Sequence, residues 1–423
     1  MIGNPPYIKE YENNAVFTDF KKISPYYMGK MDLWYGFACI GLDLLRNKGK
    51  LCFIASSQWR TSASAKILRN KICNEAKIIQ LIDFGAYMVF ETSTQAMILI
   101  ISKDSIDNNY DFLFKVNNQT IKNNHMLNIF LAERFFHLDF NRIEYRNKMF
   151  SFVINMSYKN ILDKIEKIGN FKIDDKKEII QGIIGGPDKA FKVKNKNISL
   201  FSKAEQAFIQ PFYTTTVSYY TPIAKDSILY ISDKNIEDFS SEKYPNIYKK
   251  LLKYSAELEG RREVVAGKKS WFSLWWERDE SFFKDGKKIV FASRTRGRNF
   301  TYTEDKFYAS RNCFILKSER INLKYLTALL NSKILTFYMH NKLKKNGDLL
   351  QLDKAQFTLM PLYCPDNNIQ DKVSDIVTKI IATKKECINS DITIYEQKID
   401  EVIYKLYGLT PKEIVIVESN LSI

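Results

Sequence analysis

The chain has 423 residues, of which 64 are basic and 48 acidic, so its formal net charge is +16, and 45% of its residues are hydrophobic. This length suits two or three domains, and the hydrophobic fraction fits a globular protein. The sequence contains neither a signal peptide nor an apolar run of membrane-spanning length, and we therefore expect a cytoplasmic protein.

The excess of positive charge predicts a polyanionic partner, and nucleic acid is the first candidate. The chain also has 24 tyrosines and 29 phenylalanines, which could stack on bases while Lys and Arg neutralise phosphates. The alternative is a basic surface that serves only solubility. Because the six cysteines form no C-x-x-C pair and the three histidines do not cluster, we expect reduced thiols and no metal site.

The first candidate site is the motif Asn4-Pro5-Pro6-Tyr7, called the NPPY motif below. Two consecutive prolines fix φ and carry no N–H, so the turn is stiff and its carbonyl oxygens have no neighbouring donor. The Asn side chain adds another carbonyl oxygen, and the Tyr adds a flat ring. Such a turn could accept both N–H groups of an exocyclic amine and so localise the lone pair on its nitrogen. The alternatives are an ordinary Asn-Pro turn and a polyproline II peptide ligand.

The segment that follows the NPPY motif alternates between helical and strand patterns. In chain order the pattern predicts a substrate-covering loop at 8–30, a helix at 32–46 with Leu33, Phe37, Ile40 and Leu44 as its apolar face, a strand at 51–55, a helix at 62–75, a strand at 78–84, a loop at 85–94 and a strand at 95–102. This order is that of the second half of a doubly wound α/β domain, whose reactive loops lie at the carboxyl ends of the strands.

Residues 1–103 resemble the C-terminal half of the S-adenosylmethionine-dependent DNA methyltransferases that modify amino groups, in their adenine-N6 branch. The resemblance rests on the NPPY motif, on the tetrapeptide at 32–35, on the strand at 50–55 and on Phe90. It implies that the NPPY residues are catalytic: Asn4 and Pro5 bind the adenine amino group on the turn that Pro6 stiffens, and Tyr7 stacks on the flipped-out base. Phe90 would contact the other side of the base, or else be an ordinary core aromatic.

The same family binds its cofactor through a glycine-rich loop and an acidic residue that should precede position 1. No G-x-G sequence occurs anywhere in this chain. We therefore expect an incomplete S-adenosylmethionine site, with its residues upstream of Met1 or on another chain. The chain would then be a fragment, a truncated product or one subunit of a split enzyme.

A second candidate site lies in the C-terminal half of the chain. Arg294, Arg296 and Arg298 occupy alternate positions and would share one face if the chain were extended there. Arg binds guanine edges or phosphate bidentately, so we expect at least one of the three to read a base. Lys344 and Lys345 suit phosphate contacts. The alternative for any one of them is a solvated surface charge.

Residues 171–365 resemble the target-recognition domain of TaqI-like and type IIG restriction-modification enzymes. The resemblance rests on the turn of Gly182 and Gly185 with Phe191, on the strand at 288–290 before the arginines, and on the segment Leu-Asn-Ser-Lys at 330–333. It implies that Gly185 lies with the Arg and Lys residues at the DNA surface. Type IIG enzymes place a metal-dependent nuclease at the N-terminus, and we expect neither a nuclease nor a metal site in this chain.

The last part of the chain is predicted to be helical and to serve packing. An apolar stripe at 399–406 ends at Gly408, and Thr410, Pro411 and Glu413 form the pattern of a capping box with Pro at the first helical position.

The predicted fold class is therefore α/β, with four parts. They are the C-terminal half of a Rossmann-like methyltransferase sheet at 1–115, a helical linker region at 116–170 with an amphipathic helix near 158–168, an α+β target-recognition domain at 171–365, and C-terminal helices at 366–423. The predicted function is a site-specific adenine-N6 DNA methyltransferase of a restriction-modification system, acting on double-stranded DNA. The alternative is a non-catalytic DNA-binding specificity module or subunit with a vestigial NPPY motif.

Overall fold

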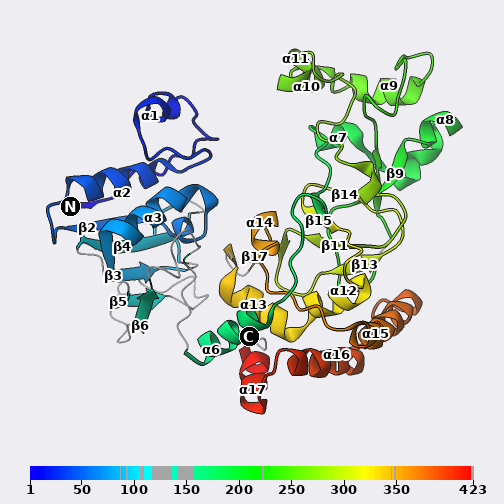
Figure 1. Cartoon of the computed structure of the whole chain (residues 1–423). Coiled ribbons are helices and arrows are strands. Elements are labelled where there is room, and N and C mark those ends of the chain that lie inside the picture. Colours follow the sequence, from blue (N-terminus) through cyan, green and yellow to red (C-terminus); the bar gives the residue numbers. More distant parts are fainter. Residues whose placement is uncertain are drawn as a thin grey trace. The chain divides into compact units, whose positions relative to one another are not determined.

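The chain forms two compact units, Met1–Lys159 and Asn160–Ile423, in the computed structural model of the protein (Figure 1). We call them unit 1 and unit 2. The residues that the structure describes are 1–85, 87–91, 94–104, 109–116, 136–141, 150, 156–221, 223–343, 345–346 and 349–420. None of the helices in these residues is long and apolar enough to cross a membrane.

Unit 1 is built on one mixed sheet of six strands in the order β1-β2-β4-β3-β5-β6. The strands are β1 (Ile2–Gly3), β2 (Lys50–Ser56), β3 (Ala76–Asp83), β4 (Ala96–Lys103), β5 (Asn109–Val116) and β6 (Phe136–Asn141). β1 pairs parallel with β2, and β4 pairs antiparallel with both β2 and β3. It follows that β1, β2 and β3 run in the same direction and end at the same edge of the sheet.

Two helices and one face of the sheet enclose the main core of unit 1. The helical segments are α1 (Phe17–Ile23), α2 (Leu33–Leu44), η1 (Ser57–Arg60), η2 (Ala63–Ala65) and α3 (Lys66–Glu75). Alternate residues of β2, including Leu51 and Phe53, are buried in one cluster with Trp34 and Leu42 of α2 and Ile72 of α3. Burial of each large side chain contributes roughly 1.5–3 kcal/mol, so this cluster fixes the sheet against both helices.

The helices and strands predicted between residues 32 and 102 are confirmed as α2, β2, α3, β3 and β4. The buried face of α2 and the direction of β4 differ from the prediction. The expected apolar face of α2 is wrong, because Phe37, Ile40 and Leu44 are exposed and the opposite face of the helix is buried. β4 runs antiparallel to its neighbours, whereas a doubly wound half-domain would run parallel. The physical reason is that only residues 84–95 join β3 to β4, which is at the lower limit for a parallel crossover, whereas a direct return reverses the strand.

Two predicted boundaries in unit 1 also change. The segment expected to be a loop at 8–30 contains α1, and the buried Phe17 anchors that helix in the core. The expected helical linker at 116–170 contains β6, which pairs antiparallel with β5. Leu138 and Phe140 of β6 are buried at alternate positions, so the strand period outweighs the Asn- and Lys-rich composition around it. The amphipathic helix predicted near 158–168 is confirmed as α6 (Met156–Ile168).

The described residues of unit 2 form three small sheets. One has the order β14-β9-β10-β8, with strands Tyr308–Ala309, Ile209–Tyr213, Asp226–Leu229 and Lys192–Lys194. The second has the order β13-β11-β15-β7, with strands Thr301–Thr303, Lys288–Ala292, Cys313–Leu316 and Ile179–Gln181. The third has the order β12-β17-β16, with strands Arg294–Thr295, Leu349–Gln351 and Lys345–Asn346.

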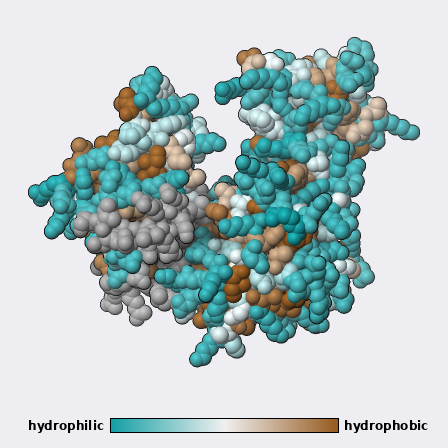
Figure 2. Space-filling model, in the orientation of Figure 1, coloured by the Kyte–Doolittle hydropathy of each residue, from teal (hydrophilic) through white to brown (hydrophobic). Residues whose placement is uncertain are grey.

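Most of the short helical segments of unit 2 lie in its first half, and its longer helices after α6 lie in its second half. The short segments are α7 (Asp188–Phe191), η3 (Asn195–Leu200), α8 (Lys203–Gln206), α9 (Pro245–Leu252), α10 (Ser255–Glu259), α11 (Arg262–Val265), η4 (Glu280–Phe282) and α14 (Lys354–Phe357). The longer helices are α12 (Leu323–Asn331), α13 (Lys333–Lys342), α15 (Asn367–Glu386), α16 (Thr393–Leu406) and α17 (Pro411–Asn420). The view in Figure 2 shows a largely hydrophilic surface with scattered hydrophobic patches on both units.

The predicted helical tail is confirmed in detail. α16 buries Ile399 and Ile403, and Gly408 follows it with a φ of +61°, a conformation that Gly adopts without strain. The backbone N–H of Thr410 donates to the Glu413 carboxylate at 2.7 Å, and the Glu413 N–H donates back to the Thr410 hydroxyl at 3.4 Å. This is the capping box that the sequence predicts at the start of α17.

Candidate functional site

Three segments of unit 1 meet at one edge of its sheet. β1 ends at Gly3 and leads directly into the NPPY motif, β2 ends at Ser56 and leads into η1, and β3 ends at Asp83 and leads into the loop that carries Phe90. Because the three strands run in the same direction, these segments all follow carboxyl ends. This is the position at which open α/β sheets bind ligands.

The structure brings Tyr7 and Phe90 together, although 82 residues separate them in the chain. Their ring centroids are 5.9 Å apart with planes at 64°, an edge-to-face arrangement, and both rings are partly exposed. The Tyr7 hydroxyl donates a hydrogen bond to the Ile54 carbonyl in β2 at 2.7 Å. This bond fixes the tyrosine ring against the sheet edge and leaves its face to be covered by another group.

The carbonyl groups of the NPPY motif are available to a ligand. Pro5 is buried and anchors the turn, whereas Asn4 is exposed. Among the residues that the structure describes, none donates a hydrogen bond to the Asn4 side chain or to the Asn4 and Pro5 carbonyls. An amine placed here could therefore donate both of its N–H groups without displacing a bond within this part of the protein.

Asp32 adds a buried carboxyl group next to the motif. Its backbone forms an antiparallel β-bridge with Lys9, and the Leu33 N–H donates a hydrogen bond to the Ile8 carbonyl at 2.9 Å. These contacts hold the chain just after Tyr7 against the start of α2. The side chain is only 6% exposed, and its Oδ1 has no hydrogen-bond partner among the described residues. Burial raises the pKa of Asp32 to about 6, and burial together with the Asp32 charge raises the pKa of Tyr7 to about 12.

An ion pair at the same edge was not predicted from the sequence. Arg60 of η1 contacts the Asp83 carboxylate at 2.6 Å, and the other oxygen of Asp83 accepts from the Gly85 N–H at 3.0 Å. Gly85 has a φ of +58°, so a residue tolerant of the left-handed region is needed where this loop begins. The pair ties the segments after β2 and β3 together. The signal that could have found it is a pair of opposite charges placed at the ends of two parallel strands.

The predicted arginine array of unit 2 does not lie on one extended face. β12 ends at Thr295, and Gly297 follows with a φ of +151°, so the chain turns between the arginines. Arg294 and Arg296 are exposed. Arg298 is only 26% exposed and forms an ion pair with Glu396 of α16 at 3.0 Å. The expectation of a shared face is therefore wrong, because it assumed an extended strand where Gly297 turns the chain.

The other predicted DNA contacts fall in three different settings. Lys344 lies outside the described residues, and only the backbone of Lys345, in β16, is described. Gly185 is buried, and a Cβ there would lie 3.4 Å from the Phe191 ring and 3.7 Å from Leu274. The close approach therefore serves packing within unit 2, and Gly185 offers no surface to a ligand. Gly182, likewise, lies directly against the backbone at Ser310.

Two protein-family models match separate parts of the chain. Residues 1–90 match the model of the Eco57I restriction-modification methylases, and residues 222–362 match the TaqI-like C-terminal specificity domain. Both matches agree with the resemblances found in the sequence.

Two relatives extend these matches along the chain. The type II methyltransferase M.HindII of Haemophilus influenzae is 22% identical over 451 residues, which cover 94% of this chain and 82% of that protein. The type II methyltransferase M.MjaIV of Methanocaldococcus jannaschii is 26% identical over 251 residues, or 57% of this chain and 82% of that protein.

A solved structure has a similar fold. The type IIL restriction-modification enzyme MmeI, in complex with DNA, superposes with a TM-score of 0.66 at 11% sequence identity. The match covers all of this chain but only 56% of that one, so the chain spans just over half the length of this neighbour.

Proposed function

We propose that this chain, in which an Eco57I-type methylase segment precedes a TaqI-like specificity domain, is the base-binding and DNA-reading part of a site-specific DNA adenine-N6 methyltransferase of a restriction-modification system. The observation that carries the proposal is the meeting of Tyr7, Phe90 and the NPPY carbonyls, which accept no hydrogen bond from the described residues, at the carboxyl edge of one sheet. The similarity to type II methyltransferases supports the same reaction class.

In this proposal unit 1 binds an adenine that has been turned out of the duplex. Stacking on the Tyr7 ring, with Phe90 at its edge, offsets the few kcal/mol lost when the base leaves its pair. The carbonyl oxygens of Asn4 and Pro5 accept the two N–H groups of the exocyclic amine. These bonds draw the nitrogen toward tetrahedral geometry and localise its lone pair, which makes a weak aromatic amine nucleophilic without a general base.

S-adenosylmethionine supplies the electrophilic methyl group in this reaction class. The chain has no G-x-G sequence, and we assign none of its described residues to the cofactor. We propose that unit 1 is the C-terminal half of a methyltransferase sheet and that an upstream segment or a partner chain supplies the cofactor half.

The proposal is tested in two steps. Calorimetric titration of the chain with S-adenosylmethionine should show no binding with or without mixed-sequence duplex, while duplex binding itself is steeply salt-dependent. Stoichiometric cofactor binding by the chain alone would contradict the missing half and leave the reaction intact. Co-expression with a chain or segment that supplies the cofactor half should then yield N6-methyladenine in nuclease digests of DNA, and N4-methylcytosine instead would contradict the adenine assignment.

The alternative, a specificity module without catalysis, predicts a different response to Tyr7→Ala. If the chain only reads DNA, the variant and the wild type leave the same methylation level in the co-expression assay. If unit 1 holds the target base, Tyr7→Ala abolishes methylation while duplex binding by unit 2 persists.

A further inference from the structure

The three-stranded sheet of unit 2 places one exposed arginine directly opposite a glutamine. β12 pairs antiparallel with β17, so that Arg294 faces Gln351 and Thr295 faces Leu350. The N–H of Leu352 donates to the Ser293 carbonyl at 2.8 Å, which makes that flanking pair the hydrogen-bonded one. Arg294 and Gln351 therefore form the adjacent non-hydrogen-bonded pair, in which side chains approach most closely.

Burial shows which way this pair faces. Thr295 and Leu350 are buried, and so is Leu352 two residues further along, whereas Arg294 is exposed and Gln351 is partly exposed. Side chains alternate between the two faces of a strand. The sheet thus packs one face into unit 2 and carries Arg294 and Gln351 side by side on the other face.

Arg294 and Gln351 differ in how many of their hydrogen-bonding groups are already used within the protein. Among the residues that the structure describes, none forms a hydrogen bond or ion pair with the Arg294 guanidinium, in contrast to Arg298, which Glu396 engages. The Gln351 amide nitrogen donates to the Asp353 carboxylate at 3.0 Å. Asp353 thereby sets the direction of the amide, and the amide oxygen and second N–H have no hydrogen-bond partner among the described residues.

This pairing fits the chemistry of base edges in the major groove. A guanidinium donates two hydrogen bonds to the O6 and N7 of guanine, and a primary amide accepts from N6 and donates to N7 of adenine. Paired strands fit into the major groove, and cross-strand Cβ atoms lie about 5 Å apart, so two long side chains on such a pair can reach two successive base pairs, whose rise is about 3.4 Å. Because Asp353 already orients the Gln351 amide, the side chain loses less conformational entropy when it binds the base.

We propose that Arg294 and Gln351 form a cross-strand reading pair that recognises a guanine and an adenine at neighbouring positions of the target sequence, with Asp353 as the residue that positions the Gln351 amide. The inference deepens the proposed function and rests on it. It assigns sequence preference to β12 and β17 and leaves the methylated adenine to unit 1.

The test is selection of bound duplexes from a randomised library by the full chain, followed by sequencing. Gln351→Ala should reduce the preference for adenine at one position by about tenfold, and Arg294→Ala the preference for guanine at its neighbour by a similar factor. Gln351→Glu should shift the preference at the adenine position toward cytosine, because a carboxylate accepts a hydrogen bond from the cytosine amino group. Asp353→Ala should broaden only the adenine position. Arg311→Ala, which removes the same charge from another exposed site, should leave the motif unchanged.

The outcomes separate this inference from the proposed function. If the wild type selects a motif and all of these variants select the same one, the pair contacts phosphate or nothing, and the inference is overturned while the function stands. If Arg294→Ala loses affinity equally for all sequences, Arg294 contacts phosphate, and the inference is again overturned while the proposed function stands. A wild type that selects no motif overturns both. Circular dichroism and thermal unfolding check that each variant is folded.

Discussion

The buried carboxyl of Asp32 should destabilise unit 1 at neutral pH, and Asp32→Asn should remove that cost. Its pKa is about 6 in the folded chain against an ordinary value of 3.8, because burial disfavours the charged form. A difference of about 2 pKa units corresponds to roughly 3 kcal/mol of folding free energy, at 1.36 kcal/mol for each unit. The side chain is 6% exposed, so solvent screening does little to reduce this figure.

The sign of the effect follows from proton binding. The folded state holds a proton on Asp32 more tightly than the unfolded state, so the contribution of this group is fully stabilising below pH 3.8 and is lost as the pH rises through 6. An amide has the same shape and carries no charge. Asp32→Asn should therefore be more stable than the wild type at pH 7.5, by at most about 3 kcal/mol, and the gain should vanish near pH 4.

The assay is urea unfolding of both proteins at several pH values between 4 and 8, read by circular dichroism. Asp19→Asn is the matched control, because Asp19 is an exposed carboxylate in the same unit and its change should shift stability by less than about 0.5 kcal/mol at any pH. A difference between Asp32→Asn and the wild type that stays constant over this pH range would refute the reasoning. So would a variant that is less stable at pH 7.5.

Three further predictions concern the two candidate sites. Tyr7→Phe should lose the bond to the Ile54 carbonyl at a cost of about 1 kcal/mol in urea unfolding and keep part of the methylation, whereas Tyr7→Ala also loses roughly 1–3 kcal/mol of base stacking and should abolish it. Arg60→Ala should destabilise unit 1 by about 3 kcal/mol, because it leaves the Asp83 carboxylate buried without its cation, and a double-mutant cycle measures the pair. Arg298→Ala should lower stability without changing the salt slope of duplex binding, because its partner in α16 already holds the guanidinium; a slope reduced by about one unit would identify a phosphate contact instead.

Much of the candidate active site could be predicted because its chemistry is local and its position follows from topology. The NPPY motif is stiff by composition, and the loop with Phe90 follows a strand parallel to the one before Tyr7, so both were expected at one edge. The Arg60–Asp83 pair was missed because neither residue belongs to a motif, and only the three-dimensional meeting of two strand ends relates them.

The orientation of α2 could not be predicted from its periodicity. This helix has apolar residues on both sides, so the spacing of Phe37, Ile40 and Leu44 gives a helix without saying which side faces the sheet. The direction of β4 depends on the length of the preceding loop, and the face of each arginine depends on the turn at Gly297. Each of these features is decided by packing between segments, which the local pattern does not contain.

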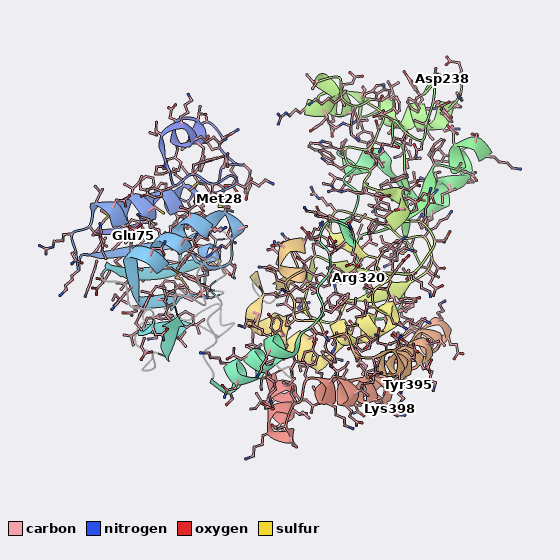
Figure 3. All side chains as sticks on the ribbon, viewed as in Figure 1. Met28, Glu75, Asp238, Arg320, Tyr395 and Lys398 are labelled. Carbon is pink, nitrogen blue, oxygen red and sulfur yellow. The ribbon has the colours of Figure 1, made fainter. Side chains whose placement is uncertain are left out.

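Net charge alone does not identify a DNA surface in this protein, because several of its arginines are already engaged. The guanidinium of the buried Arg261 donates to the carbonyls of Ser273 and Trp271 at 2.8 and 2.7 Å. Arg320, labelled in Figure 3, contacts Glu178 at 2.5 Å and lies 4.7 Å above the ring of Phe171.

Arginines of this kind hold loops together, and their positive charge is balanced or screened within the fold. Arg294 differs from them, because it is exposed, has no partner among the described residues and lies beside an amide whose direction is already set. An unengaged donor next to an oriented one can discriminate between bases, whereas an unengaged donor alone binds phosphate just as well. The pairing of Arg294 with Gln351, more than the excess of basic residues, is therefore the reason to expect sequence recognition in unit 2.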